Sequence, residues 1–118
     1  MSLRMGSAPR AAYGLERAAA VEALRAGQHE RAWRHLERAH VVAQPFPVAH
    51  VGAHVAMLRL GWRVRDRVEV LGQVVRIVVA GPGSAFGRYP TGNTGRARVP
   101  LRAEMPVPPD LATLEASS

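Results

Sequence analysis

The sequence predicts an all-α protein: four helices in two antiparallel hairpins, followed by an irregular C-terminal tail. Apolar residues recur at helical spacing through the first two thirds of the chain, and short glycine- or proline-containing segments separate these stretches. After Gly81-Pro82-Gly83 the composition changes to glycine, proline and arginine. We therefore expect a disordered N-terminus over 1–7, a helical domain over 8–80, and a Gly/Pro-rich tail over 81–118 packed on the helices.

The first hairpin is expected from two helices that meet at Gly27. The first covers 8–26, which is rich in alanine and other strong helix formers, and Gly27 ends it in the manner of a C-terminal glycine cap. The second covers 29–43, and Pro45 stops it. The predicted core stripes are Leu15, Ala18, Val21 and Leu24 in the first helix, and Ala32, Leu36, Ala39 and Ala43 in the second.

The second hairpin is expected from a helix that begins at Pro47 and a helix capped by Asp66 that runs to about Ala80. The β-branched content of 67–80 also permits a strand, but its polar residues do not alternate and a lone strand would have no partner. Trp62 is expected in the core. The predicted core faces are Val48, Val51, Val55, Leu58 and Trp62 in the third helix, and Val68, Leu71, Val75 and Val78 in the fourth, with Glu69, Gln73 and Arg76 on the opposite, outer face of the fourth.

Composition restricts the classes of function. The net charge is +7 and all sixteen cationic residues are arginine, which suits nucleic acid or an acidic partner but also a solubilising surface; without a nucleic-acid-binding motif the surface interpretation is favoured. Cysteine is absent, so disulfides, thiolate metal sites and cysteine nucleophiles are excluded. With no secretory apolar segment near the start and no uncharged run of about 20 residues, we expect a cytoplasmic protein that does not span a membrane.

The first hairpin resembles a single tetratricopeptide unit. Gly27 stands at the turn, and Ala32, Leu36 and Ala39 follow with a proline a few residues later. The first helix lacks the large residues of that repeat, and no second copy occurs at a period of about 34 residues. The resemblance therefore implies a hairpin geometry but no repeat array.

Several short segments between 33 and 111 carry a further resemblance. They are Leu36-Glu37-Arg38-Ala39-His40, His50, His54, Met57-Leu58-Arg59-Leu60-Gly61-Trp62, Glu69-Val70-Leu71-Gly72-Gln73, Gly92-Asn93-Thr94-Gly95 and Met105-Pro106-Val107-Pro108-Pro109-Asp110-Leu111. With these segments the chain resembles a family of short bacterial proteins catalogued only as a domain of unknown function. The resemblance implies that the tail belongs to the folded unit, and it brings no activity.

The candidate site consists of Glu37, His40, His50 and His54. Glu37 and His40 are spaced i, i+3 on one helix, and His50 and His54 are spaced i, i+4 on the next. Antiparallel neighbouring helices would bring the four side chains together, and such a donor set suits Zn, Fe, Ni or Cu. Two alternatives stay open: a structural His/Glu hydrogen-bond network between the helices, and histidines exposed to solvent.

Catalysis is less favoured than binding. His29-Glu30 could begin an HExxH metalloprotease motif, but Trp33 occupies the position of its second histidine. The sequence also contains no phosphate-binding loop motif. His29 and His35 are expected at the surface. The Gly92-Asn93-Thr94-Gly95 segment is interpreted as a tight turn that needs positive φ.

A second hypothesis is an interaction module with a basic surface. Arg59, Arg63 and Arg67 repeat at i, i+4 and would bind an acidic protein or peptide. Nucleic acid is a third, less favoured partner, and the sequence predicts no oligomeric state. The alternative is a solvated helix face whose arginines pair with Asp66, Glu69 and Glu104.

Overall fold

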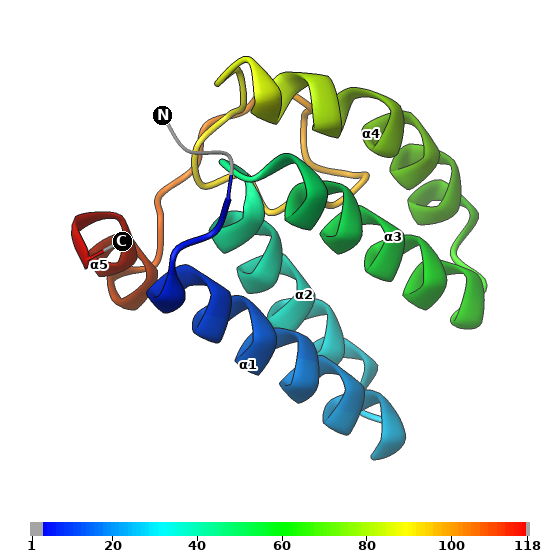
Figure 1. The fold of residues 1–118 in the computed structure, drawn as a ribbon. Helices are drawn as coiled ribbons and strands as arrows, with labels where there is room; N and C mark the ends of the chain where they lie inside the picture. Colours follow the sequence, from blue (N-terminus) through cyan, green and yellow to red (C-terminus); the bar gives the residue numbers. More distant parts are fainter. Residues whose placement is uncertain (1–3, 118) are drawn as a thin grey trace.

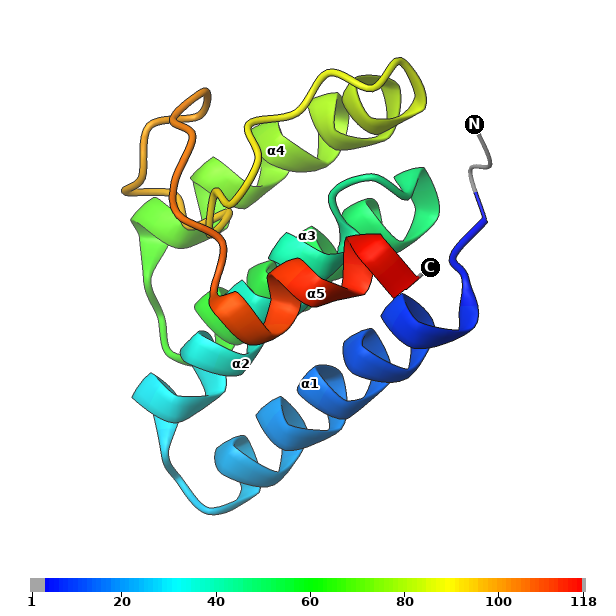
Figure 2. The same ribbon diagram turned by 90° about the vertical axis from the view of Figure 1, so that its left-hand side faces the viewer.

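The structure, a computed structural model, describes residues 4–117 and, as far as residue 114, their side chains. It contains helices and no strands in this range. The helices are α1 (Ser7–Arg25), α2 (His29–Ala43), α3 (Pro47–Arg63), α4 (Arg67–Ala85) and α5 (Pro109–Ser117). α1 and α2 form one antiparallel hairpin and α3 and α4 form the second (Figure 1), while α5 lies along α1 and α2 (Figure 2). The all-α class and the two hairpins are confirmed.

Local sequence signals explain most helix ends. Gly27 adopts φ 73° after α1, and the Asp66 side chain accepts a hydrogen bond from the Glu69 amide at 3.2 Å at the start of α4. The expected disorder over 1–7 falls partly on residues 1–3, outside the described part, and α1 already begins at Ser7.

The tail departs from the expected irregular segment at both ends. α4 continues through Pro82 to Ala85, five residues beyond the expected end, because Ser84 in its last turn bonds to the Gln44 carbonyl. The segment 88–105 then crosses the space beside α2 and α4 without regular structure, and α5 follows (Figure 1).

The core is built from small residues around a few large ones. The predicted stripe of α2 is buried as expected, from Ala32 to Ala43. The main hydrophobic cluster consists of Ala20, Ala23, Ala32, Trp33, Leu36, Met57 and Leu60. Alanines at these contacts allow the helices to approach closely, so the core of this small domain contains few bulky groups.

The predicted core faces of α1 and α3 are only partly buried: Leu24 packs against the core, and Val51, Val55 and Leu58 are half-buried. Leu15 and Val21 on α1 are exposed, and on α3 Val48 is 88% exposed and Trp62 is 75% exposed. α3 instead buries the face that carries Ala53, Met57 and its histidines. The reason is that the small and polar residues of this face find close helix contacts and hydrogen-bond partners, whereas the valine stripe lies at the edge of the core, where Val51 is beside Gly81 of α4.

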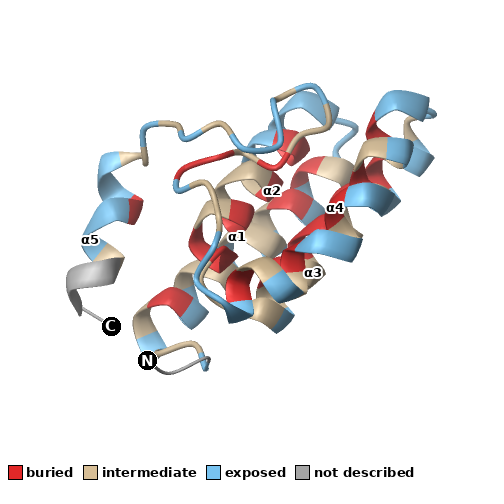
Figure 3. Cartoon of the chain, turned by 90° about the horizontal axis from the view of Figure 1, so that it is seen from above, coloured by how far each residue is buried: buried red, intermediate tan, exposed pale blue. Residues whose placement is uncertain are grey.

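The orientation of α4 is also opposite to the prediction. Glu69, Gln73 and Arg76 are buried, and Leu71 and Val78 are 70% and 71% exposed (Figure 3). The segment 88–105 supplies backbone partners to the polar face, and burial of polar groups is tolerated only when they are hydrogen-bonded. Among the described residues α4 is also the one helix long and apolar enough to cross a bilayer, although its polar face packs inside the protein.

Candidate metal centre

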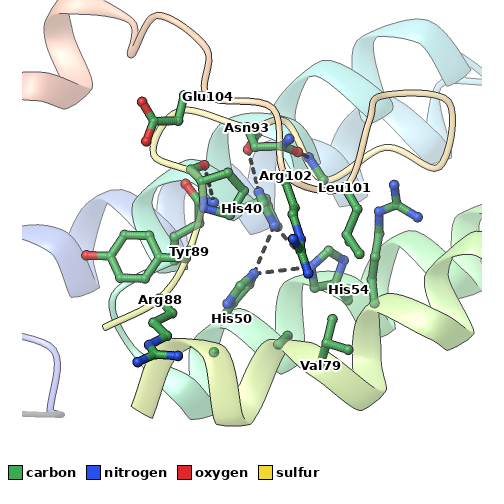
Figure 4. A pocket seen from close by; sticks show the side chains of 16 residues that line it. His40, His50, His54, Val79, Arg88, Tyr89, Asn93, Leu101, Arg102 and Glu104 are labelled. Carbon is green, nitrogen blue, oxygen red and sulfur yellow. Dashed lines mark hydrogen bonds between the residues drawn. The ribbon is translucent and has the colours of Figure 1, made fainter. Parts of the chain in front are cut away.

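Three histidines converge at the boundary between the two hairpins. His40 lies near the end of α2, and His50 and His54 lie one turn apart in α3. Their Nε2 atoms are separated by 3.0 Å (His40–His54), 3.0 Å (His40–His50) and 3.2 Å (His50–His54). Figure 4 shows the three rings turned toward a common point, and each residue is at most 6% exposed. The short connection Gln44–Phe46 brings α3 back beside α2 and makes this convergence possible.

The second ring nitrogen of His40 and of His50 is held by an acceptor. The Nδ1 of His40 lies 2.7 Å from the Asn93 carbonyl oxygen, which can only accept. The Nδ1 of His50 lies 2.5 Å from the Ser84 Oγ. Ser84 donates its own hydroxyl proton to the Gln44 carbonyl, so its oxygen accepts from His50. Both rings therefore carry their proton on Nδ1.

The same argument fixes His54. Its Nδ1 lies 2.7 Å from the Gln73 Oε1. The Gln73 Nε2 donates to the Glu69 carboxylate at 3.1 Å and to the Gly95 carbonyl at 2.8 Å, which sets the orientation of the amide. His54 must then donate from Nδ1, and its Nε2 is an acceptor.

The three rings are neutral at neutral pH. Burial lowers the pKa of His50 to about 3 and of His54 to about 4, and it lowers the pKa of His40 well below the ordinary value; repulsion from neighbouring rings adds to the effect at His40 and His50. With one proton each, all on Nδ1, the rings direct three Nε2 lone pairs at one another and no hydrogen lies between them. Buried acceptors without a donor are unfavourable, and a cation at their centre removes the conflict.

The spacing of the nitrogens fits a first-row metal ion. With metal–nitrogen bonds of about 2.1 Å, ligand nitrogens lie about 3.0 Å apart on one face of an octahedron and about 3.4 Å apart in a tetrahedron. The observed 3.0–3.2 Å is closest to the octahedral face. The acceptors behind the rings are the kind of outer partners that orient metal-binding histidines.

Glu37, the predicted fourth ligand, is not brought to these nitrogens. Its carboxylate accepts a hydrogen bond from Arg96 at 3.1 Å, and burial raises its pKa against the effect of that arginine. Among the described residues, the side chains that could hold a metal ion at this point are those of His40, His50 and His54 alone. Arg96 comes from the tail, so the local i, i+3 spacing did not reveal this pairing.

The predicted basic face is exposed, and two of its three expected acidic partners, Asp66 and Glu69, pair with other arginines. Among the side chains of residues 4–114, Arg59, Arg63 and Arg67 form no ion pair, so the solvated face lacks the expected pairing. Asp66 pairs with Arg98 at 2.8 Å and Glu69 with Arg96 at 2.6 Å. The other surface histidines behave largely as expected: His29 is exposed and His35 is half-buried against Glu16.

Sequence reasoning missed the residues that hold the rings in place. Gln73 lies on the α4 face that was expected to point outward, and Ser84 lies in the part of α4 that was expected to belong to the tail; their helical spacing with Glu69 was the available signal. Asn93 lies in the predicted turn, whose flanking Gly92 and Gly95 have φ 78° and 83° as expected. The Asn93 side chain donates to the carbonyls at 100 and 103, which fixes the turn beside His40.

A cavity of about 580 Å³ opens in front of the cluster. The three histidines form part of its wall (Figure 4). A metal on the Nε2 atoms would thus have protein ligands on one side and accessible space on the other, the arrangement of an open coordination site.

The fold and this cluster define a small all-α protein with a buried three-histidine site between two helix hairpins. Residues 7–114 match the model of the family described as "Protein of unknown function (DUF3703)", and the chain belongs to this family. The match includes the tail with Asn93 and Gly95. No curated protein and no solved structure matches the chain.

Proposed function

We propose that this protein binds a divalent transition-metal ion (Zn, Fe, Ni or Cu) in the cytoplasm through the Nε2 atoms of His40, His50 and His54, and zinc is the ion used below to test it. The observation that carries the proposal is the fixed protonation of the rings: every Nδ1 has an acceptor, so every Nε2 lone pair faces the centre. Imidazole nitrogens suit Zn, Fe, Ni and Cu alike, and availability decides among them as much as affinity.

A purely structural histidine network accounts less well for the same geometry. Hydrogen bonds between Nε2 atoms would need a second proton on at least one ring. The depressed pKa of His50 and His54 opposes that protonation at neutral pH. A metal ion satisfies all three nitrogens without any added proton.

Metal content of the untagged chain tests the proposal. We expect one zinc ion per chain by elemental analysis after loading and dialysis, and loss of that zinc in H54A and in H40Q. H29A is the matched control, because His29 is exposed at the start of α2, and it should keep full stoichiometry. Circular dichroism checks that each variant is folded. Zinc well below one per chain, or undiminished zinc in folded H54A, would overturn the proposal.

The surface around Trp62 supports a second candidate function, an interaction module for an acidic peptide or protein. A pocket of about 570 Å³ is lined by Trp62, Arg65, Arg67 and Leu71 among others, and Arg59 and Arg63 lie exposed on the same helix as Trp62. An apolar side chain of a partner would fill the pocket while its carboxylates pair with the arginines. The tetratricopeptide-like hairpin predicted from the sequence also favours an interaction module.

Fluorescence anisotropy with a labelled synthetic peptide of Glu and Leu residues tests this candidate. We expect salt-sensitive binding that W62A and R59E/R63E abolish, whereas R4Q at the other end of the chain leaves it unchanged. A labelled DNA duplex serves as the comparison for nucleic acid. Binding of the duplex alone, or peptide binding unaffected by R59E/R63E, would contradict the interaction module.

A further inference from the structure

The cavity in front of the histidines is strongly basic. Arg76, Arg88 and Arg102 line it, and Glu104 is the carboxylate residue in its wall (Figure 4 labels Arg88, Arg102 and Glu104). Three guanidinium groups face one carboxylate, so the lining carries excess positive charge even before a metal ion adds to it.

Arg76 is the most enclosed of these cations. It is 7% exposed, and it donates to the backbone carbonyls of Gly72 at 3.1 Å and Val99 at 2.8 Å. These acceptors are neutral, and Arg76 has no carboxylate within ion-pair distance in the part of the chain that the structure describes. Burial lowers the pKa of Arg76, and the Glu69 carboxylate partly offsets this effect.

Arg88 and Arg102 reach the cavity from the segment that follows α4. Both are exposed, and neither forms an ion pair with the described side chains of residues 4–114. Guanidinium groups bind carboxylate and phosphate oxygens through paired hydrogen bonds, so each of these arginines at the rim offers a contact for such a group.

The size and the apolar part of the wall indicate more than an inorganic ion. The cavity of about 580 Å³ has the volume typical of sites for small organic ligands. Val79 and Leu101 line it together with the arginines, and Figure 4 shows both among the residues around the cluster.

We propose that the cavity binds a small organic oxyanion, a carboxylate or a phosphate ester, and that one of its oxygens completes the coordination of the metal held by His40, His50 and His54. This inference rests on the proposed metal binding. The three histidines occupy one side of the metal, and the cavity leaves the other side to the ligand, whose charge the arginines neutralise.

Cobalt-loaded protein tests the inference, because the visible d–d absorption of Co²⁺ changes when a ligand enters its coordination sphere. Succinate and phenyl phosphate are the two anionic probes, and succinamide is the neutral counterpart. We expect both anions to shift the spectrum with saturation and succinamide to leave it unchanged. R88Q and R102Q should weaken anion binding at least tenfold with cobalt content unchanged, and R59Q on the outer face of α3 should have no effect.

The outcomes separate this inference from the metal proposal. Stoichiometric cobalt with a spectrum that neither anion changes would overturn the inference and leave metal binding standing. An equally strong spectral shift with inorganic phosphate would overturn the claim that the ligand is organic. Anion binding of equal affinity in the metal-free protein, measured by calorimetry, would overturn the claim that the anion coordinates the metal. A chain that binds no cobalt removes both proposals.

Discussion

At the scale of single residues, the cluster depends on groups that never touch its centre. His54 keeps its Nε2 lone pair pointed inward because its Nδ1 donates to Gln73, and Gln73 is itself held by Glu69 and the Gly95 carbonyl. Such outer partners fix the tautomer and orientation of a ligating ring. Gln73 therefore belongs to the site as much as a ligand does.

Replacing Gln73 with methionine should weaken zinc binding about 10- to 100-fold, because the His54 ring loses the acceptor that orders it. Competition against a chromophoric chelator measures the affinity. Q28M is the matched control, since Gln28 is exposed at the turn between α1 and α2, and it should bind as the parent does. An affinity of folded Q73M within twofold of the parent would contradict this role.

The lowered pKa values predict how the metal-free protein responds to acid. Well above pH 6.5 these rings are neutral in both the folded and the unfolded state, so they add no pH dependence. As the pH falls below 6.5 the unfolded chain takes up protons, while folded His50 and His54 stay neutral down to about 3 and about 4. Stability should fall in this window by about 1.4 kcal/mol per pH unit for each ring.

Urea unfolding of the metal-free chain between pH 7.5 and 4.5 measures this slope. H50Q should reduce it, and H29A should leave it unchanged because His29 is exposed. A free energy of unfolding that stays flat across this range would show that the rings are not buried in neutral form.

The three histidines of the site were predictable from sequence, and their surroundings were not. Spacings of i, i+4 in α3 and a short connection to α2 are local features, so His40, His50 and His54 could be placed together. Arg96, which takes the Glu37 carboxylate away from the cluster, is 59 residues distant along the chain. No local pattern encodes a contact made by an irregular segment.

At the scale of elements, helix type was predictable, whereas helix orientation was predicted wrongly for α4 and only in part for α1 and α3. The assumption that the most apolar stripe faces the core succeeded for α2 and failed for α4, where Glu69 and Gln73 are fully buried. Hydrogen bonds from the segment 88–105 offset the free-energy cost of burying these two side chains. The composition of this segment predicts only that it has no regular secondary structure. The position of this segment thus decides which face of α4 is inside.

Substitutions of glycine test how closely the segment 88–105 packs against the histidine cluster. A Cβ at Gly95 would lie 2.6 Å from the His40 Cδ2, and Gly95 also has positive φ. G95A should therefore destabilise the protein by about 1–3 kcal/mol and weaken zinc binding as His40 is displaced. Gly27 has positive φ but open space around it, so G27A should cost about 1 kcal/mol without affecting zinc.

Gly14 completes the series as the control. It lies inside α1, and a methyl group added at its Cα would meet nothing within 4 Å, so G14A should stabilise the helix by about 0.5–1 kcal/mol. Thermal unfolding and zinc competition are measured on all three variants. Equal zinc affinity in G95A and G27A would show that the close approach to His40 is unimportant.

At the scale of the whole molecule, the main hydrophobic cluster joins the first hairpin to α3, whereas polar contacts connect α4 to the rest of the structure. The apolar cluster includes residues of α1, α2 and α3, from Ala20 to Leu60, but no residue of α4. The histidine cluster and its acceptors connect α2, α3, α4 and the tail instead. Most valines of α4 are left exposed on the surface of the molecule.

Metal loading should therefore stabilise the assembly of the two hairpins. A ligand that binds only the folded state at 100 times its Kd adds about 2.7 kcal/mol, which corresponds to a rise in Tm of roughly 10 °C for a domain of this size. Hydrogen exchange should show the gain in protection in α3, α4 and the turn around Asn93, because the metal joins His40 of one hairpin to His50 and His54 of the other. The first turns of α1 contact α5 and are distant from the cluster in sequence. Their protection should rise little more than the increase in global stability requires. H54A supplies the control: zinc should leave its Tm unchanged, and an equal rise in H54A would place the stabilising zinc at a different site.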